Sequence, residues 1–297
     1  MAPAIRPPGI SALIITIIAA SAPVFYHLVS LHLTSLSSYL ISYSSSTSET
    51  FGQDIEHASS SLPTSPSFSC LQHAYTTEII SLDPLLIYID SFLAAAEVDA
   101  LLEAGELRFA PSRVYKQGRN QGTSDRTSSS AGLPRDNPAV QCVLERAEAF
   151  LGTMLDRSRD DIGPPQLVRY TAGQRFNRHR DWYERPQPAR EGLLGRGKSW
   201  NRIASFFAIL QDQCTGGETW FPLVNTTVPS RDDQKGRQLW KTHEDGGVAF
   251  RPIAGNALFW VNLFANGTGD DRTVHAGSPV REGLKTAMNI WPRKFYG

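Results

Sequence analysis

The chain has 297 residues, which suits one large β-rich domain with additional segments or about two average domains. Lysine plus arginine and aspartate plus glutamate each number 29, so the formal net charge is zero and the basic excess typical of nucleic-acid-binding proteins is missing. Aromatic residues make up 10% and charged residues 20%, which excludes a coiled coil and a disordered chain. We therefore expect a globular protein with no nucleic-acid partner.

The three cysteines, Cys70, Cys142 and Cys214, are few and scattered along the chain. This excludes a disulfide scaffold and a cysteine-based zinc site. One pair could still form a bridge in an oxidising compartment, but we expect no functional role for the thiols.

The N-terminal part of the chain differs from the rest. Residues 7–48 contain no charged side chain, and within them 10–29 are mostly apolar and long enough to cross a bilayer as a helix. Residues 1–30 are therefore predicted to be an uncleaved, single-pass signal anchor of the endoplasmic reticulum or another secretory-pathway membrane. Because Arg6 precedes the apolar run, the N-terminus is expected in the cytoplasm and everything downstream, including the catalytic domain, in the lumen. A cleaved signal peptide ending at the small residues 20–22 is the close alternative, and a buried core helix is a weaker one.

Residues 31–76 are rich in serine, with interspersed threonine and proline and few aromatic residues. Such a segment buries too little apolar surface to fold, so it is predicted to be a stalk or linker. The globular part is then expected at 77–297. Two glycosylation sequons, Asn225–Thr227 and Asn266–Thr268, lie within it and favour a secretory location.

Two amphipathic helices are predicted near the start of the globular part. Asp90 or Ser91 is expected to cap the first helix, which ends near Leu107. For the second helix, Asn137 is the predicted cap and Pro138 the first residue. Both helices need a sheet to cover. The apolar stripe of the second helix comprises Val140, Val143, Leu144, Ala147, Phe150, Leu151 and Met154.

The remainder of the globular part is rich in short segments typical of strands. Strands that follow helices in a run predict an antiparallel sandwich or barrel instead of a doubly wound sheet. The predicted strands are Gln166–Thr171, Arg202–Leu210, Glu218–Phe221, Gly247–Arg251, Ala257–Val261 and Lys285–Pro292. Two long polar inserts, Arg185–Trp200 and Pro229–Asp245, are expected to be mobile surface loops, and His243 a solvated residue in the second.

A metal site is predicted from residues far apart in the chain. His179 and Asp181 are two positions apart on an extended segment, so their side chains point to the same face. His275 supplies a second imidazole. Two histidines and one carboxylate leave coordination positions open, as in the facial triad of non-haem Fe(II) oxygenases. Lys285, further along, is expected to be the cation that binds a carboxylate-bearing cosubstrate.

These residues belong to a longer ordered series of motifs. The series comprises Arg126–Ser129, Leu167–Phe176, His179–Asp181, Gly216–Pro222, Gly255–Trp260 and His275–Val280, followed by Lys285 and Trp291. Over about Leu85 to Arg293, it resembles the catalytic domain of the prolyl 4-hydroxylases. The resemblance implies a mainly β, double-stranded β-helix (jelly roll) domain with flanking helices, preceded here by the membrane helix.

The resemblance also implies the chemistry. It predicts Fe(II), the cosubstrates 2-oxoglutarate and O₂, and L-ascorbate as the reductant that keeps the iron reduced. The reaction would be hydroxylation of prolyl residues in proteins or peptides, as by procollagen-proline 4-dioxygenases, with succinate and CO₂ as co-products. The residues matched by position are His179, Asp181 and His275 for the iron, Lys285 and Tyr170 for the distal carboxylate of 2-oxoglutarate with Trp291 packed beside it, and Arg126 and Trp182 for the substrate.

Two departures from the family leave the substrate open. Phe176 stands where the family often has tyrosine, and the two inserts lie where loops would cover a substrate. The same oxygenase chemistry on another residue or on a small metabolite is therefore an alternative hypothesis. A catalytically dead, membrane-anchored jelly roll that acts as a binding module is a third. Gly216 and Gly217 are expected only to form a turn.

Overall fold

The computed structural model describes residues 68–297, except residue 71 and the segments 117–118, 122–123 and 190–196. The predicted anchor at 1–30 and most of the predicted stalk at 31–76 lie outside the described residues, so both stay predictions. Within the described part of the chain, no helix is long and apolar enough to cross a bilayer.

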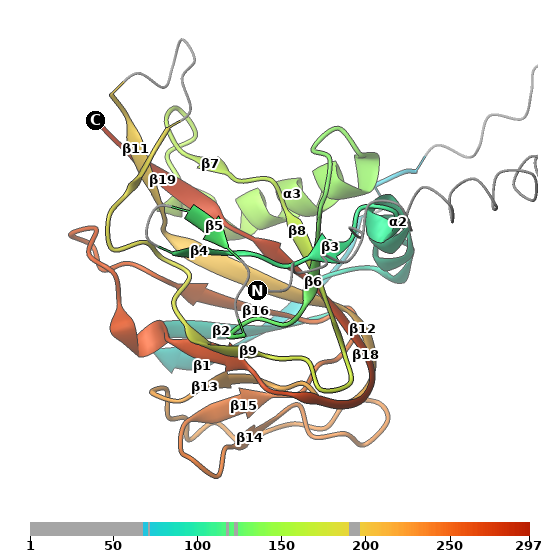
Figure 1. The fold of residues 1–297 in the computed structure, drawn as a ribbon. Helices are drawn as coiled ribbons and strands as arrows, with labels where there is room; N and C mark the ends of the chain where they lie inside the picture. Colours follow the sequence, from blue (N-terminus) through green and yellow to red (C-terminus); the bar gives the residue numbers. More distant parts are fainter. Residues whose placement is uncertain (1–67, 71, 117–118, 122–123, 190–196) are drawn as a thin grey trace, which may run out of the picture. The chain divides into compact units, whose positions relative to one another are not determined.

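An eight-stranded antiparallel sheet forms the centre of the domain (Figure 1). Its long strands β12 (Ala204–Gly216) and β18 (Val280–Ile290) pair along almost their whole length. Successive residues in both strands are buried, so apolar side chains are covered on both faces of the sheet. In spatial order the strands are β1 (Thr76–Leu82), β2 (Leu85–Asp90), β16 (Ala257–Val261), β12 (Ala204–Gly216), β18 (Val280–Ile290), β8 (Gln166–Thr171), β6 (Ser129–Gly132) and β3 (Ala110–Pro111).

A five-stranded sheet packs against one face of this sheet through a shared apolar core. The core joins Tyr88 and Trp260 to Phe221, Trp240 and Phe250. Two facing antiparallel sheets of this kind confirm the predicted mainly β, jelly-roll-like fold. The strands of the smaller sheet are β14 (Trp240–Thr242), β15 (Val248–Phe250), β13 (Thr219–Phe221), β17 (His275–Gly277) and β9 (Phe176–His179).

The remaining strands form two peripheral sheets. A four-stranded sheet comprises β10 (Gln187–Pro188), β11 (Ser199–Arg202), β19 (Pro292–Tyr296) and β7 (Asp161–Ile162). A hairpin comprises β4 (Val114–Lys116) and β5 (Arg119–Gln121). The short 3₁₀ helices are η1 (Gly152–Met154) and η2 (Asp271–Thr273).

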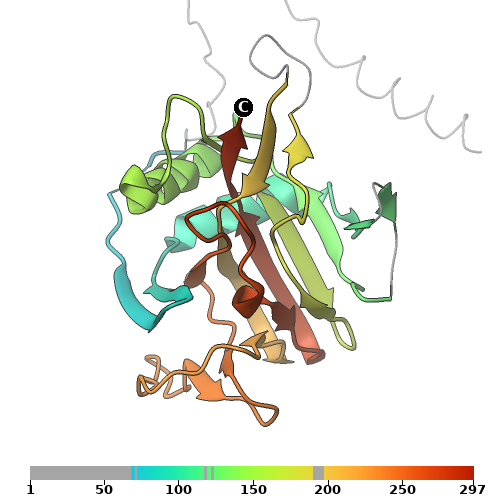
Figure 2. The same ribbon diagram turned by 90° about the vertical axis from the view of Figure 1, so that its left-hand side faces the viewer.

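Two helices, α2 (Ala95–Glu106) and α3 (Pro138–Leu151), cover the other face of the eight-stranded sheet (Figures 1 and 2). The predicted start of α3 is confirmed, because the Asn137 side chain accepts hydrogen bonds from two backbone N–H groups of the first turn. A buried ion pair of 2.5 Å between Glu97 on α2 and Arg146 on α3 joins the two helices.

The predicted cap of the first helix is wrong. Ser91 adopts a left-handed conformation with φ of 58°, so the chain turns there and the helix begins later, with Ala94 at its N-cap. The Glu97 carboxylate accepts the Ala94 N–H at 2.9 Å and so satisfies one free donor of the helix end.

The prediction that Pro229–Asp245 is only a mobile surface loop is also wrong. Leu239 and Trp240 are each 2% exposed, because the indole packs on Tyr88 at a ring distance of 5.3 Å and the segment forms β14. His243 is not simply solvated either, since its ring stacks on Trp220 at 4.2 Å. In the first insert, Arg185–Trp200, the described residues supply β10 and the start of β11.

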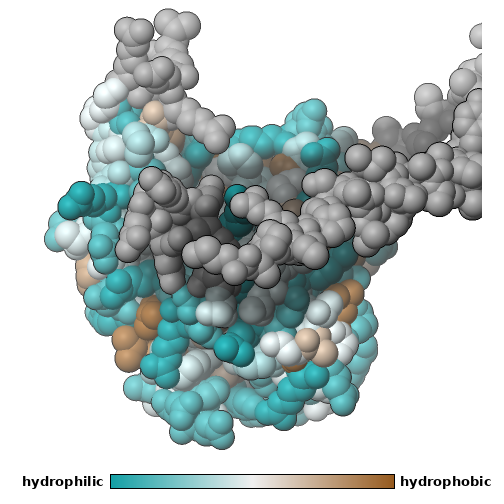
Figure 3. Space-filling model, in the orientation of Figure 1, coloured by the Kyte–Doolittle hydropathy of each residue, from teal (hydrophilic) through white to brown (hydrophobic). Residues whose placement is uncertain are grey.

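The end of the predicted stalk contacts the folded domain. Phe68 and Tyr75 pack against the helical core, and Cys70 forms a disulfide with Cys142 of α3, while Cys214 is a free cysteine. Apart from these contacts, the described surface in Figure 3 is mainly hydrophilic, with apolar side chains scattered over it. Over the whole described part of the chain, the exposed large apolar residues are Ile79, Leu82, Leu107, Leu223 and Phe264.

Candidate active site

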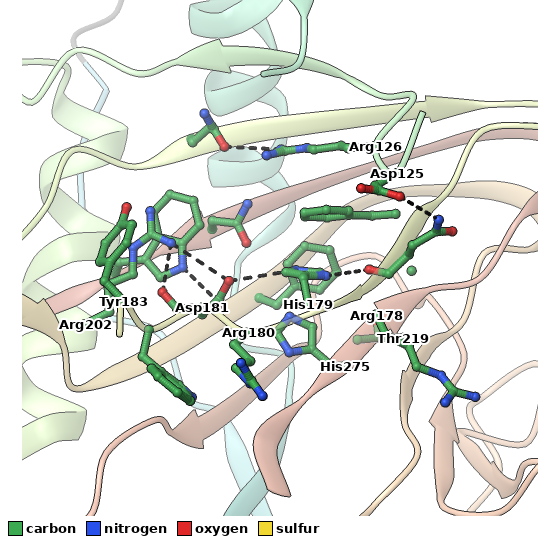
Figure 4. Close-up of a pocket in the computed structure, with 18 of the residues that line it drawn as sticks. Asp125, Arg126, Arg178, His179, Arg180, Asp181, Tyr183, Arg202, Thr219 and His275 are labelled. Carbon is green, nitrogen blue, oxygen red and sulfur yellow. Dashed lines mark hydrogen bonds and ion pairs between the residues drawn. The ribbon is translucent and has the colours of Figure 1, made fainter. Parts of the chain in front are cut away.

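A pocket of about 460 Å³ lies between the eight-stranded and five-stranded sheets (Figure 4). Its walls come from both sheets, for example Tyr170 of β8 and Phe207 of β12 on one side and His179 of β9, Thr219 of β13 and His275 of β17 on the other. The pocket is therefore built by the packing of the two sheets and not by one loop.

Three predicted metal ligands meet in this pocket. His275 is the direct register partner of His179 in the pairing of β17 with β9, and their ring centroids are 4.3 Å apart. Asp181 follows β9, and its Oδ1 lies 3.9 Å from Nε2 of His179. One ligand atom from each residue lies within 4.8 Å of the other two, so the three could hold one metal ion.

Backbone carbonyls fix the protonation of both imidazoles. Nδ1 of His179 donates to the carbonyl of Asn177 at 2.8 Å, and Nδ1 of His275 donates to that of Thr273 at 3.0 Å. Because a carbonyl only accepts, each Nδ1 carries a hydrogen, so Nε2 is the ring nitrogen that would bind a metal. Burial, reinforced by His275, also lowers the pKa of His179, which favours the neutral imidazole that a metal requires.

The carboxylate of Asp181 is held by one of its two oxygens. Oδ2 accepts from Ser205 Oγ at 2.6 Å and from Trp291 Nε1 at 3.0 Å, and the Ser205 oxygen in turn accepts from Asn262 Nδ2 at 2.9 Å. Oδ1 makes no hydrogen bond among the described residues and lies 3.9 Å from both Nε2 of His179 and Nη1 of Arg202, so it is available as a metal ligand.

The charge of Asp181 is maintained although it is buried. Burial would raise its pKa, but His275, Arg202 and His179 together with the Ser205 hydrogen bond outweigh that effect and hold the pKa well below its usual range. Arg202 also donates to the backbone carbonyl of Asp181 at 3.1 Å and lies flat on the Trp291 ring at 3.7 Å. The group that holds Asp181 thus includes three residues that the sequence did not single out: Ser205, Asn262 and Arg202.

Lys285 is a buried cation close to the rings of Tyr170 and Phe207, which line the pocket. It is 2% exposed, and its Nζ donates to the carbonyl of Gly217 at 2.7 Å. Among the described residues, no carboxylate lies within 4.0 Å of this ammonium. Burial lowers its pKa to about 8. A buried ammonium without a carboxylate partner fits a site that receives an anionic ligand.

The surroundings of Lys285 explain two other sequence features. Tyr170 is its register partner on β8, and the ammonium lies 5.8 Å from the Tyr170 ring and 5.0 Å from that of Phe207. Gly217 has φ of 71°, and a Cβ there would lie 3.4 Å from Cδ of Lys285. Gly217 therefore does more than form the expected turn, because its carbonyl holds the lysine.

The predicted substrate residues belong to the pocket wall. Arg126 lies over the Phe176 ring at 4.9 Å, and Phe176 stacks on His179 at 3.5 Å. Burial lowers the pKa of the Arg126 guanidinium. Trp182 packs on Gly269, where any Cβ would meet the indole, and its Nε1 donates to the carbonyl of Asp270 at 3.2 Å.

The structure brings together the residues that the sequence predicted for the site. All of them line the pocket except Lys285, whose ammonium lies behind Tyr170 and Phe207. Trp291 differs from its expected place, because it donates to Asp181 instead of only packing beside the cosubstrate site. No local signal could have found Ser205 or Asn262, since Ser205 donates to Asp181 and Asn262 donates to Ser205 across segments that are distant in the chain.

A jelly-roll-like domain with two histidines, one carboxylate and a buried lysine is typical of non-haem Fe(II) oxygenases that use an oxo-acid. Residues 165–293 match the family model of the 2OG-Fe(II) oxygenase superfamily.

The chain is also similar in sequence to curated prolyl 4-hydroxylases. The chain is 28% identical over 222 residues to the probable prolyl 4-hydroxylase 9 of Arabidopsis thaliana, covering 73% of this chain and 71% of the relative. It is 28% identical over 211 residues to prolyl 4-hydroxylase subunit alpha-1 of Rattus norvegicus, covering 70% of this chain and 34% of that subunit. The viral collagen prolyl hydroxylase of Paramecium Bursaria Chlorella virus-1, solved as a 2OG complex, has 21% identity and a TM-score of 0.48, covering 70% of this chain and 95% of that one. The chain is therefore similar to the 2OG-Fe(II) oxygenase superfamily and to the prolyl 4-hydroxylases, and this similarity supports an oxidoreductase.

Replacing Ser205 by alanine is expected to weaken metal binding about tenfold, because Asp181 Oδ2 loses its hydroxyl donor and the carboxylate is no longer held in place. Calorimetric titration of Mn(II) into the metal-free protein measures this. Ser158→Ala is the matched control, since that hydroxyl makes a similar 2.6 Å bond to the Asp156 carboxylate on an exposed turn. Equal affinities in the two variants would show that the Ser205 bond does not position the ligand.

Proposed function

We propose that this protein is a 2-oxoglutarate- and Fe(II)-dependent dioxygenase that hydroxylates prolyl residues in proteins or peptides, with succinate and CO₂ as co-products. One observation carries the proposal: His179, Asp181 and His275 converge with their ligand atoms free, beside a buried lysine that has no carboxylate partner among the described residues. The prolyl 4-hydroxylases among the relatives support the prolyl substrate.

In this proposal the two histidines would hold the iron through Nε2 and Asp181 through Oδ1. The iron, when bound with 2-oxoglutarate and O₂, supplies the oxidising chemistry, and ascorbate keeps it reduced. The chain contributes orientation: carbonyl acceptors fix the two imidazoles, and Ser205 and Trp291 fix the carboxylate. The aromatic walls of the pocket exclude water from the reacting centre.

Lys285 would bind the distal carboxylate of 2-oxoglutarate, assisted by the Tyr170 hydroxyl. The two side chains are register partners on adjacent strands, so they point to the same face of the sheet. Tyr170 stays protonated, because burial raises its pKa, although the charge of Arg126 opposes this. A neutral hydroxyl can donate to a carboxylate that the ammonium has already attracted.

The full-length protein, supplied with Fe(II), ascorbate and 2-oxoglutarate, is expected to release succinate faster when a proline-rich peptide is present. The peptide should become heavier by one oxygen atom. In His179→Ala and Asp181→Asn both signals should fall to background, because the metal loses a ligand. His73→Ala, a histidine outside the pocket, is the matched control.

Mass spectrometry of the peptide and a succinate assay measure the two products. Full turnover in either ligand variant would refute the iron assignment. Succinate release without peptide stimulation would favour the alternative substrates, another residue or a small metabolite.

The KM for 2-oxoglutarate is expected to rise as the pH is raised through about 8. The lowered pKa of Lys285 means that its ammonium is charged below that pH and becomes neutral above it, so the attraction for the carboxylate is lost on the alkaline side. Lys285→Arg should remove this dependence, since guanidinium keeps its proton, whereas Lys285→Met should raise KM at every pH. A KM for the unaltered enzyme that stays constant from about pH 7 to 9.5 would contradict the role of Lys285.

We also propose that the domain works in the lumen of the endoplasmic reticulum or another secretory compartment, tethered through residues 1–30. The disulfide between Cys70 and Cys142 supports an oxidising environment. The exposed positions of Asn225 and Asn266 in their sequons support access to the glycosylation machinery.

Expression in eukaryotic cells is expected to give a protein whose mobility shifts on treatment with an N-glycosidase and which resists protease in sealed microsomes. Asn225→Gln combined with Asn266→Gln should abolish the shift, and Thr268→Ser, which keeps its sequon, should not. An unglycosylated protein that protease digests in intact microsomes would refute the luminal location.

A further inference from the structure

The titratable residues that line the pocket, apart from the two histidines, are unbalanced in charge. Two are aspartates, Asp125 and Asp181. Five are arginines: Arg113, Arg126, Arg178, Arg180 and Arg202. This excess is local, because the whole chain has a formal net charge of zero.

Carboxylate partners are present for only some of these arginines in the described part of the chain. Arg180 pairs with Asp271 at 2.6 Å, and Arg202 lies 3.9 Å from Asp181. For Arg113 and Arg178, no carboxylate of the described residues lies within 4.0 Å, and both side chains are exposed. Two guanidinium groups at the pocket are thus charged, accessible and without an acidic partner in the described part of the chain.

The iron and its cosubstrate would not change this balance. The two positive charges of Fe(II) and the ammonium of Lys285 would be matched by Asp181 and the two carboxylates of 2-oxoglutarate. Asp181 would then no longer offset Arg202, so the positive excess of the pocket lining persists. Arg113 and Arg178 stay available for a third component of the reaction, which is the substrate.

Arg178 is also held in an orientation suited to a carboxylate. Its guanidinium lies over the Trp220 ring at 4.6 Å, and the indole is fixed by a hydrogen bond of 2.8 Å to the carbonyl of Gly246 and by stacking with His243. An arginine that lies flat on an aromatic ring keeps the N–H groups along its edge free for a planar acceptor. In Figure 4 this side chain leaves β9 next to His179 and projects away from the three metal-ligand candidates.

We propose that the protein substrate carries acidic residues close to the hydroxylated residue and that Arg178 and Arg113 bind them at the rim of the pocket. The inference rests on the proposed function, because it assumes a peptide segment in the pocket. Arg178 and His179 line the same pocket, so the acidic residues fall within a few positions of the target residue.

Three peptides that share a central prolyl residue and differ only in their flanks, which are glutamate, glutamine or lysine, test this proposal with the full-length protein. Both the dissociation constant, by fluorescence anisotropy, and hydroxylation, by mass spectrometry, are measured. The glutamate peptide is expected to bind about tenfold more tightly than the glutamine peptide, and the lysine peptide most weakly. The preference should shrink at about 0.5 M salt, because exposed charges are screened.

Arg178→Gln is expected to reduce the preference for glutamate over glutamine about threefold. Arg178→Glu should reduce the preference about tenfold and so remove it, because a reversed charge has about twice the effect of a neutral one. Hydroxylation of the glutamine peptide, which should be retained, shows that the variant is folded. Arg108→Gln is the matched control: Arg108 is exposed beyond the end of α2, outside the pocket, and its loss changes the net charge equally.

The peptide experiment distinguishes failure of the acidic-substrate proposal from failure of the proposed prolyl hydroxylation. Equal binding and equal hydroxylation of the three peptides would overturn the acidic-substrate proposal and leave prolyl hydroxylation intact. Selective binding of the glutamate peptide without hydroxylation would support acidic recognition and overturn the prolyl substrate. An unchanged preference in Arg178→Glu would show that this arginine does not bind the flanks.

Discussion

The pairing of β17 with β9 is the contact on which the site depends. It sets His275 opposite His179 in register, so two imidazoles from distant parts of the chain face one point. In each case the backbone carbonyl two residues earlier accepts the Nδ1 hydrogen, which leaves both Nε2 atoms available. A shift of one residue in this register would turn one imidazole to the opposite face of the sheet and remove the site.

Burial of charge is the second constraint, and the chain meets it differently for its two buried charges. Asp181 is surrounded by donors and by the charges of its neighbours, so it is stable as a carboxylate. Lys285 has only the Gly217 carbonyl as its hydrogen-bond acceptor among the described residues, and its lowered pKa records the cost of that burial. The negative charge of an anionic cosubstrate would offset this cost, and its carboxylate would supply the anionic partner of Lys285.

Local sequence patterns predicted a large part of this structure. β8 and β16 have the predicted bounds, and α3 begins at the predicted proline behind its asparagine cap, because these features depend on neighbouring residues. The spacing of His179 and Asp181 on a strand was equally local, and the ordered motifs placed His275 and Lys285.

Contacts between distant segments could not be predicted in this way. Ser205 and Trp291 reach Asp181 only because β12 and the end of β18 run beside it. Trp240 looked like part of a polar loop, but it packs on Tyr88, far away in the chain. The late start of α2 depends on the left-handed turn at Ser91, a conformation that serine rarely adopts.

A crystal structure of the protein grown without oxygen, with Fe(II) and 2-oxoglutarate, tests the central claim most directly. We expect the metal between Nε2 of His179, Oδ1 of Asp181 and Nε2 of His275, with the distal carboxylate of 2-oxoglutarate on Nζ of Lys285. A metal bound elsewhere, or a cosubstrate whose carboxylate leaves Lys285 without an anionic partner, would contradict this account.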